Sequence, residues 1–220
     1  MSDINRMGET VRSRAARELR DRILTGRLPA GTRLDLDQIT REFGTSRTPV
    51  REALLELSHE GLVEVAPRSG ITVLGISPED AVDSFAVLAA LSGKAAEWAT
   101  ARVGPEELAE LQRLDAAVEE ANDMVAANWR FHRAVNLASG SRRLLVHLRQ
   151  AVRAVPSSYF ELFPAQEKRS RGEHAALLGA IRRGDAAKAR VLAEAHVLEA
   201  GGALGDWLRT QHADDGHGGA

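Results

Sequence analysis

The sequence contains no cysteine, which excludes disulfide bonds and thiolate ligands. It also lacks any apolar run approaching the roughly 20 residues of a membrane-spanning helix, and its N-terminus shows no charged-then-apolar leader with a cleavage site. Aromatic residues make up 4% of the chain, and proline is infrequent in the second half. Because alanine, leucine and arginine abound, the composition favours helix over sheet. We therefore expect a mainly α-helical, cytoplasmic protein without a membrane partner.

The length of 220 residues exceeds that of one small domain and accommodates two modest ones, each with its own core. The net charge is −2 and differs little between the two parts of the chain. Such a balance does not by itself indicate a nucleic-acid partner. Any functional prediction must therefore come from motifs.

Residues 8–75 predict three short helices followed by a β-hairpin. Apolar residues recur at helical spacing from Gly8 to Thr25, and a second short helix is expected from Asp35 to Phe43. The runs Leu62–Val65 and Ile71–Leu74 are apolar and β-branched, and the turn residues between them predict a tight hairpin. With a third helix between these segments, the order is that of a winged helix-turn-helix.

The third helix carries the first candidate site. Ser46 is expected to cap it, and the i, i+3, i+4, i+7 stripe of its buried face consists of Val50, Ala53, Leu54 and Leu57. Arg47 and Arg51, four residues apart, therefore project together from the opposite face. Such a pair can enter a DNA major groove, where guanine N7 and O6 accept hydrogen bonds from a guanidinium. The alternative is that both arginines are solvated surface residues.

The segment Ser46–Leu54, which reads Ser-Arg-Thr-Pro-Val-Arg-Glu-Ala-Leu, resembles the recognition helix of GntR-family regulators almost letter for letter. The likeness extends from the first helix through the hairpin. It implies a domain that binds double-stranded operator DNA, and a symmetric homodimer would place two such helices one DNA turn apart on an inverted repeat.

The resemblance suggests further DNA contacts outside the arginine pair. Ser46 and Thr48 are placed to contact phosphate near the helix N-terminus, and Arg41 is a candidate for the DNA backbone. The wing candidates are Arg68, Ser69 and Gly70. Relatives often carry a basic residue near the start of the second helix, whereas this chain has Asp35, Asp37 and Gln38 there.

Residues 76–210 predict an all-helical bundle. A helix is expected to begin at Ser77-Pro78-Glu79-Asp80, where serine caps and proline takes the first helical position. Breaks at Gly104-Pro105, Asn122-Asp123, Gly140, Pro156–Pro164 and Gly184-Asp185 divide the remainder into about six helices. The last segment, 211–220, is expected to form a disordered tail.

Three histidines and an asparagine in this region form the second candidate site. Asn128 and His132 are four residues apart and share one helix face, whereas His174 and His196 lie equally far from Asp185 and can meet in an antiparallel helical hairpin. Three imidazoles with an oxygen donor are typical of Zn²⁺ or another first-row divalent metal. The alternative is a set of surface or hydrogen-bonded core histidines.

The segment Asn128-Trp129-Arg130-Phe131-His132 resembles the D-x-x-F-H motif of the FadR-type sensor domain, called FCD. Glu173-His174, Ala180-Ile181, Gly184-Asp185 and His196 resemble the rest of its pattern, over roughly residues 78–208. The resemblance implies that Asn128, His132, His174 and His196 ligate a divalent metal. We expect Zn²⁺, with Ni²⁺ or Mn²⁺ as alternatives.

Asparagine replaces the commoner aspartate at position 128, so four neutral ligands would leave the full metal charge. This charge favours an anionic partner, and we expect a small organic acid as effector. Leu88 and Ser92 stand where many relatives carry arginine and glutamate, which predicts a less polar pocket. Candidate carboxylate partners are Arg130, Arg133, Arg142, Arg149 and Arg153.

The function predicted from these motifs is a DNA-binding transcriptional regulator, expected to be a repressor, whose operator binding responds to the effector. One alternative is a constitutive dimeric DNA binder with a vestigial metal site. Another is a metal-dependent hydrolase, for which Glu173 is the only nearby acid in the sequence. Neighbouring residues on a helix point in different directions, so we expect no enzyme.

Overall fold

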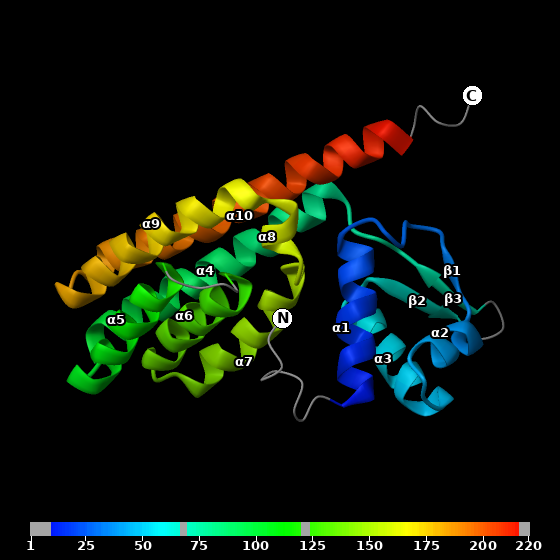
Figure 1. Ribbon diagram of the computed structural model, residues 1–220, viewed down its shortest axis with the longest axis horizontal. Coiled ribbons are helices and arrows are strands. Elements are labelled where there is room, and N and C mark those ends of the chain that lie inside the picture. The colour runs from blue at the N-terminus through cyan, green and yellow to red at the C-terminus, as the bar shows by residue number, and fades with distance from the viewer. Residues whose placement is uncertain (1–9, 67–69, 120–123, 216–220) are drawn as a thin grey trace. The chain divides into compact units, whose positions relative to one another are not determined.

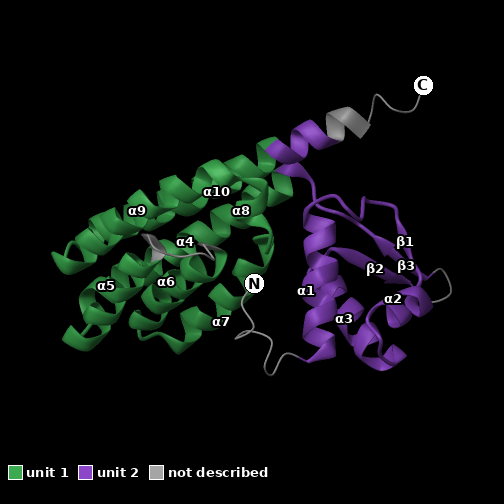
Figure 2. Ribbon diagram, in the orientation of Figure 1, with its two compact units in different colours: residues 1, 79–206 green, residues 2–78, 207–220 purple. Residues whose placement is uncertain are grey.

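The computed structural model describes residues 10–66, 70–119 and 124–215. Residues 79–206 form one compact unit, and the residues up to Pro78, together with those from Trp207, form the other (Figure 2). Within the described residues, no helix has the length and apolar character needed to cross a membrane.

The N-terminal unit has the predicted order of three helices and a hairpin (Figure 1). Its elements are α1 (Val11–Leu24), β1 (Arg33–Leu34), α2 (Leu36–Glu42), α3 (Arg47–His59), β2 (Val63–Ala66) and β3 (Gly70–Val73). The sequence did not predict β1, which pairs antiparallel with β3 and extends the hairpin to a three-stranded sheet of order β1-β3-β2. The winged helix-turn-helix is thereby confirmed.

Helix caps and one apolar stripe explain how this unit forms. The Thr10 hydroxyl accepts a hydrogen bond from the Ser13 N–H and begins α1, and Gly26, with φ +67°, follows its end. The predicted stripe of α3 is fully buried. Ser46 stands at the predicted N-cap position of α3, but its side chain makes no capping hydrogen bond, so the prediction is right for the position and wrong for a cap through the hydroxyl.

The second unit is all-helical, as predicted. Its elements are α4 (Pro78–Arg102), α5 (Pro105–Glu119), α6 (Met124–Ala138), α7 (Arg142–Ala151), a 3-10 turn η2 (Val152–Ala154), α8 (Tyr159–Leu162), α9 (Pro164–Arg182) and α10 (Ala186–Asp215). The last helix continues beyond this unit, since its residues from Trp207 are grouped with the N-terminal unit. The predicted breaks at Gly104-Pro105, Gly140 and Gly184 separate these helices, and Asn122-Asp123 lies outside the described residues. The count exceeds six because α8 forms within the Pro156–Pro164 break.

Helix α10 continues to Asp215, past the point at which the sequence suggested a tail. The first five residues of the predicted segment 211–220 are therefore helical, and residues 216–220 lie outside the described range. The tail was predicted because these residues are polar, and polarity alone does not end a helix that is already propagating.

The core of the helical unit brings together α6, α9 and α10, the three helices that carry the candidate histidines. Phe131 of α6 is fully buried in one cluster with Leu177 and Ile181 of α9 and Ala189 and Ala193 of α10. Figure 1 shows α9 and α10 running along the same unit with α4 and α6. This packing fixes the histidine-bearing faces of three helices relative to one another.

Candidate metal centre and nucleic-acid interface

The three predicted histidines meet at one point in the helical unit. His132 comes from α6, His174 from α9 and His196 from α10. The Nε2 atom of His132 lies 3.1 Å from the Nε2 atoms of both His174 and His196. All three candidate ligand nitrogens lie within 4.8 Å of one another. The prediction that His174 and His196 meet across the α9–α10 turn is confirmed.

Asn128 lies one helical turn before His132 on α6. Its Oδ1 atom is buried and has no hydrogen-bond partner. A buried carbonyl oxygen without a partner loses the hydrogen bonds that it makes in water. The family resemblance predicted this oxygen as a metal ligand beside the histidines. A bound cation would give the oxygen the partner that it lacks.

A carboxylate fixes the tautomer of His196. Because a carboxylate can only accept, the Nδ1–H of His196 donates to Glu173 Oε2 at 2.6 Å. Glu173 is itself held by Arg169, whose Nε donates to Oε1 at 2.7 Å. With its proton on Nδ1, His196 presents a lone pair at Nε2, toward the other histidines. Such carboxylate–histidine pairs commonly orient metal ligands.

Burial keeps two of the rings neutral. Desolvation, together with the neighbouring histidines, lowers the pKa of His132 well below its ordinary value. Desolvation, followed by the influence of His196, lowers the pKa of His174 to about 3. Phe131 stacks on His174 with a centroid separation of 4.4 Å. Neutral imidazoles are the form that binds a metal.

Two of the three nitrogen separations in the cluster match those around a single transition-metal ion. Nitrogens held about 2.0–2.1 Å from one zinc ion stand about 2.9 Å apart at a right angle and about 3.4 Å apart at the tetrahedral angle. The two Nε2 separations of 3.1 Å fall in this range. The residues that would hold the ion are His132, His174, His196 and Asn128.

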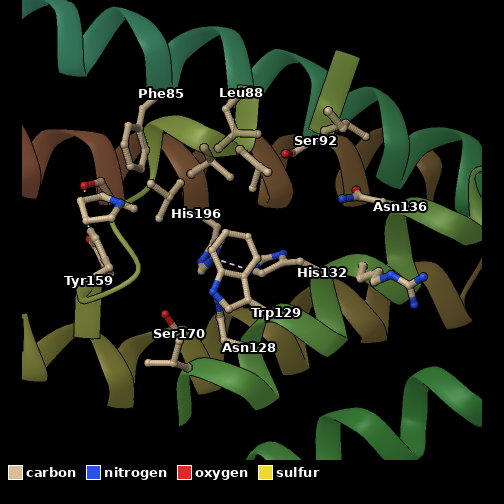
Figure 3. A pocket seen from close by; sticks show the side chains of 18 of the residues that line it. Phe85, Leu88, Ser92, Asn128, Trp129, His132, Asn136, Tyr159, Ser170 and His196 are labelled. Carbon is tan, nitrogen blue, oxygen red and sulfur yellow. Dashed lines mark hydrogen bonds between the residues drawn. The ribbon is translucent and has the colours of Figure 1, made fainter. Parts of the chain in front are cut away.

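A cavity of about 430 Å³ opens beside the cluster (Figure 3). His132, His196 and Asn128 face it, while Phe85, Leu88 and Ser92 extend from α4 on its other side. Further apolar lining comes from Leu145, Leu148, Val152, Val155, Phe160 and Val197. Leu88 contributes to this apolar lining, in keeping with the pocket of low polarity predicted from the sequence.

Four of the eight candidate DNA-contacting residues lie on α3 or at its start. Thr48 and both arginines, Arg47 and Arg51, are exposed on α3, and Ser46 is exposed at its start. Arg41 is exposed on α2. Gly70 begins β3 with φ +92°, whereas the other two wing candidates, Arg68 and Ser69, lie outside the described residues.

Arg47 has a partner that the sequence did not suggest. Its Nε and Nη2 atoms donate to Asp37 Oδ1 and Oδ2 at 2.6 and 2.7 Å. In the sequence, Asp37 was notable only because it lies where relatives often carry a basic residue. The two residues are ten positions apart on different helices, so no helical periodicity connects them. Arg51 makes no ion pair with any residue that the structure describes.

Comparison with known families agrees with both halves of this description. Residues 11–73 match the family described as "Bacterial regulatory proteins, gntR family", and residues 83–199 match the FCD domain. The chain belongs to the GntR family. It is a DNA-binding transcriptional regulator with a winged helix-turn-helix and an FCD domain.

Individual relatives of this GntR regulator carry similar names. An uncharacterized HTH-type transcriptional regulator of Agrobacterium vitis is 35% identical over 129 residues, which cover 54% of this chain and 75% of the relative. A probable D-xylose utilization operon transcriptional repressor of Paenarthrobacter nicotinovorans is 33% identical, with 61% of this chain and 64% of the relative covered. The solved structure of McbR/YncC from E. coli superposes with a TM-score of 0.66 at 26% identity, and covers 93% of this chain and 99% of that one.

The FCD domain of this regulator also contains site residues that sequence reasoning missed or misjudged. Glu173, considered only as a base, instead holds the ring nitrogen of His196 that faces away from the cluster. Two of the five candidate arginines, Arg133 and Arg149, line the cavity, and the other three do not. Trp129 and Tyr159 also line it, although nothing in their spacing marked them.

Proposed function

We propose that this GntR regulator is a repressor that binds an inverted-repeat operator as a homodimer and releases it in response to an organic acid bound at a divalent metal. The name of the Paenarthrobacter relative, a repressor, supports the direction of regulation. The observation that carries the proposal is the convergence of three Nε2 atoms beside a cavity wall that also holds the orphaned Asn128 oxygen.

The DNA-reading role falls to α3. Arg47 and Arg51 project from the face opposite the buried stripe, so α3 can enter a major groove without disturbing the core. Arg51→Ala should weaken binding to a duplex enriched from a random DNA library by about 1–3 kcal/mol. Arg182→Ala, which removes an exposed arginine of α9, is the control and should bind normally. Equal affinities of both variants and the unmodified protein would contradict the assignment of α3.

The metal-binding role falls to Asn128, His132, His174 and His196. Zn²⁺ suits a set of three imidazoles and an amide oxygen, and Ni²⁺ or Mn²⁺ are alternatives. When bound, the ion would supply an open coordination position with a net positive charge. The protein contributes the rest by burying the rings in their neutral form and by orienting His196 through Glu173.

The cavity supports an organic acid as effector. Arg133 and Arg149 line it, and neither makes an ion pair within the part of the chain that the structure describes. Two such guanidinium groups attract an anion, whereas the wall between is largely apolar. We infer an acid whose carboxylate lies toward the histidine cluster and whose carbon skeleton contacts Phe85 and Leu88.

The test uses the full-length protein in two states, stripped with a chelator and reloaded with Zn²⁺. A panel of organic acids is screened for an increase in melting temperature, and each hit is added to the protein bound to a fluorescent duplex from the library selection. We expect at least one acid to stabilise the Zn²⁺-loaded protein and release the DNA, with no effect on the stripped protein. DNA binding that no acid alters would contradict the sensor role and favour a constitutive DNA binder.

A further inference from the structure

The pairing of Asp37 with Arg47 is an exposed, bidentate contact between α2 and α3. The Arg47 side chain is 69% exposed and the Asp37 side chain 47%. Ion pairs so open to water contribute little to folding stability. A structural role in the N-terminal unit therefore does not account for the contact.

The geometry of the pair leaves part of Arg47 available. A guanidinium has five N–H groups in a rigid plane. Asp37 accepts from Nε and from Nη2, which uses one edge of that plane. Both hydrogens of Nη1 and the second hydrogen of Nη2 remain, and the Nη2 hydrogen forms the end-on edge together with the one Nη1 hydrogen that lies beside it. That edge matches the N7 and O6 acceptors of guanine, so Arg47 can contact Asp37 and a base at once.

The pair also changes how strongly Arg47 attracts DNA that lacks the cognate base. A free arginine side chain has many rotamers and attracts any phosphate, whereas a bidentate carboxylate orders the guanidinium and offsets its charge. Asp35, which caps α2 close by, adds a second negative charge that acts on Arg47. Sequence-independent binding depends on cation–phosphate contacts, so it is weaker with Arg47 paired.

We propose that Asp37 is a specificity-determining residue of this regulator, which positions Arg47 for a guanine contact and suppresses its attraction to non-cognate DNA. The inference rests on the proposed base-reading role of Arg47. Asp37 itself need not touch DNA for this effect, because it acts through the orientation and charge of its partner.

The test compares Asp37→Asn with the unmodified full-length protein on two duplexes, the one most enriched from a random library by the unmodified protein and a scrambled version of it. We expect the ratio of the two affinities to fall about tenfold, the size expected for loss of one well-oriented base contact. Binding to the scrambled duplex should become tighter, and its salt slope should steepen by about 0.9 for the phosphate contact that Arg47 gains.

The control is Glu52→Gln, which removes one negative charge from the exposed surface of α3 without removing a partner of Arg47. An affinity ratio in Asp37→Asn equal to that of the unmodified protein, or to that of Glu52→Gln, would overturn the proposal. So would an undiminished effect of Asp37→Asn in an Arg47→Ala background, since Asp37 would then act without its partner. If Arg47→Ala alone leaves the ratio unchanged, the base-reading role of Arg47 fails first, and the two failures are thereby distinguished.

Discussion

His196 can act as a ligand through Nε2 only while its proton resides on Nδ1, and Glu173 is the residue that holds it there. Hydrogen bonds from His196 and Arg169 outweigh the effect of burial and lower the pKa of Glu173 to about 2. The carboxylate is therefore ionised under ordinary conditions. Its contribution is to orient and polarise a ligand ring.

Glu173→Gln should weaken Zn²⁺ binding by roughly 10- to 100-fold, because an amide is a poorer acceptor for the His196 N–H than a carboxylate. Competition with a chromogenic chelator measures the affinity. Glu167→Gln is the matched control, since Glu167 lies on the same helix and pairs with Arg171, which is not one of the candidate ligands. An unchanged affinity in Glu173→Gln would show that the ring of His196 is oriented without this contact.

Protonation of buried groups predicts how the stability of the metal-free protein depends on pH. The pKa of His174 is about 3 in the folded protein against 6.5 ordinarily, so the unfolded chain binds the extra proton and the free energy of unfolding falls as pH drops from 6.5 toward 3. Glu173, with its pKa lowered from 4.5 to about 2, stabilises the fold above pH 4.5, and this stabilisation is lost as pH falls toward 2.

Between pH 6.5 and 4.5 the loss of stability therefore comes from buried histidines, with His132 shifted in the same direction as His174. His174→Gln should flatten the pH dependence in this window, as measured by urea unfolding with a chelator present. His147→Gln, at an exposed position of α7, should leave it as it is. An equally steep dependence in His174→Gln would mean that this ring is not a buried neutral group.

Among single residues, the sequence predicted the candidate ligands, whose spacing along the chain is regular. It did not predict contacts between residues that have no such spacing. Asn128 and His132 share a helix face, and His174 and His196 are symmetric about a turn, so geometry together with family resemblance identified the set. Asp37 and Arg47 lie on different helices at the surface, where neither burial nor periodicity constrains a pair. The missing capping hydrogen bond of Ser46 could not be predicted either, because the type of residue at a cap position does not determine its rotamer.

The contact between α4 and α10 places one wall of the cavity against the helix that carries His196. Gly201 of α10 faces Phe85 of α4 so closely that an added Cβ would lie 2.4 Å from the Phe85 Cβ. Because that atom is at the base of its side chain, the helices themselves would have to separate. Phe85 lines the cavity, so the close approach also sets the shape of the proposed effector site.

Gly201→Ala should lower the free energy of unfolding by about 1–3 kcal/mol, since overpacking outweighs the gain in helix propensity. The matched control is Gly202→Ala on the same helix, where an added Cβ meets nothing within 4 Å. Gly202→Ala should stabilise by up to about 1 kcal/mol. Urea unfolding of both variants decides between them, and a stabilised Gly201→Ala would contradict the packing described for α4 and α10.

At the element scale, apolar periodicity and breaker residues identified every long helix of the described chain. The stripe of α3 and the break at Gly184 are local signals, visible within one or two turns. Strand β1 has only two residues, and its existence depends on pairing with Thr72 and Ile71 far along the chain. Helix α8 is a single turn inside a segment bounded by prolines, too short for any period to be read.

In the whole molecule, the candidate DNA-reading residues and the candidate metal ligands lie in different compact units. Helix α3 contributes apolar residues to one core cluster, and helices α6, α9 and α10 contribute to the other. Substitutions among the histidines should therefore spare the fold and the basal DNA affinity of the N-terminal unit. For effector binding to alter DNA binding, the recognition helices of the assembled regulator must change their separation.

The protein should bind DNA as a homodimer, because one recognition helix buries too little surface for useful selectivity. Sedimentation of the full-length protein should give twice the mass of the chain, and footprinting on a library-selected duplex should protect two inverted half-sites about one helical turn apart. Protection of a single unpaired half-site by a monomer would contradict this arrangement.

We claim that the histidine cluster holds one metal ion per chain, and titration of the chelator-treated protein with Zn²⁺ followed by elemental analysis decides whether it does. We expect one equivalent bound by the unmodified protein and by His147→Ala, and none by His174→Ala or His196→Ala, with DNA affinity retained in all four proteins. Failure of the unmodified protein to bind a stoichiometric metal, either as purified or on titration, would contradict the claim and leave the cluster vestigial.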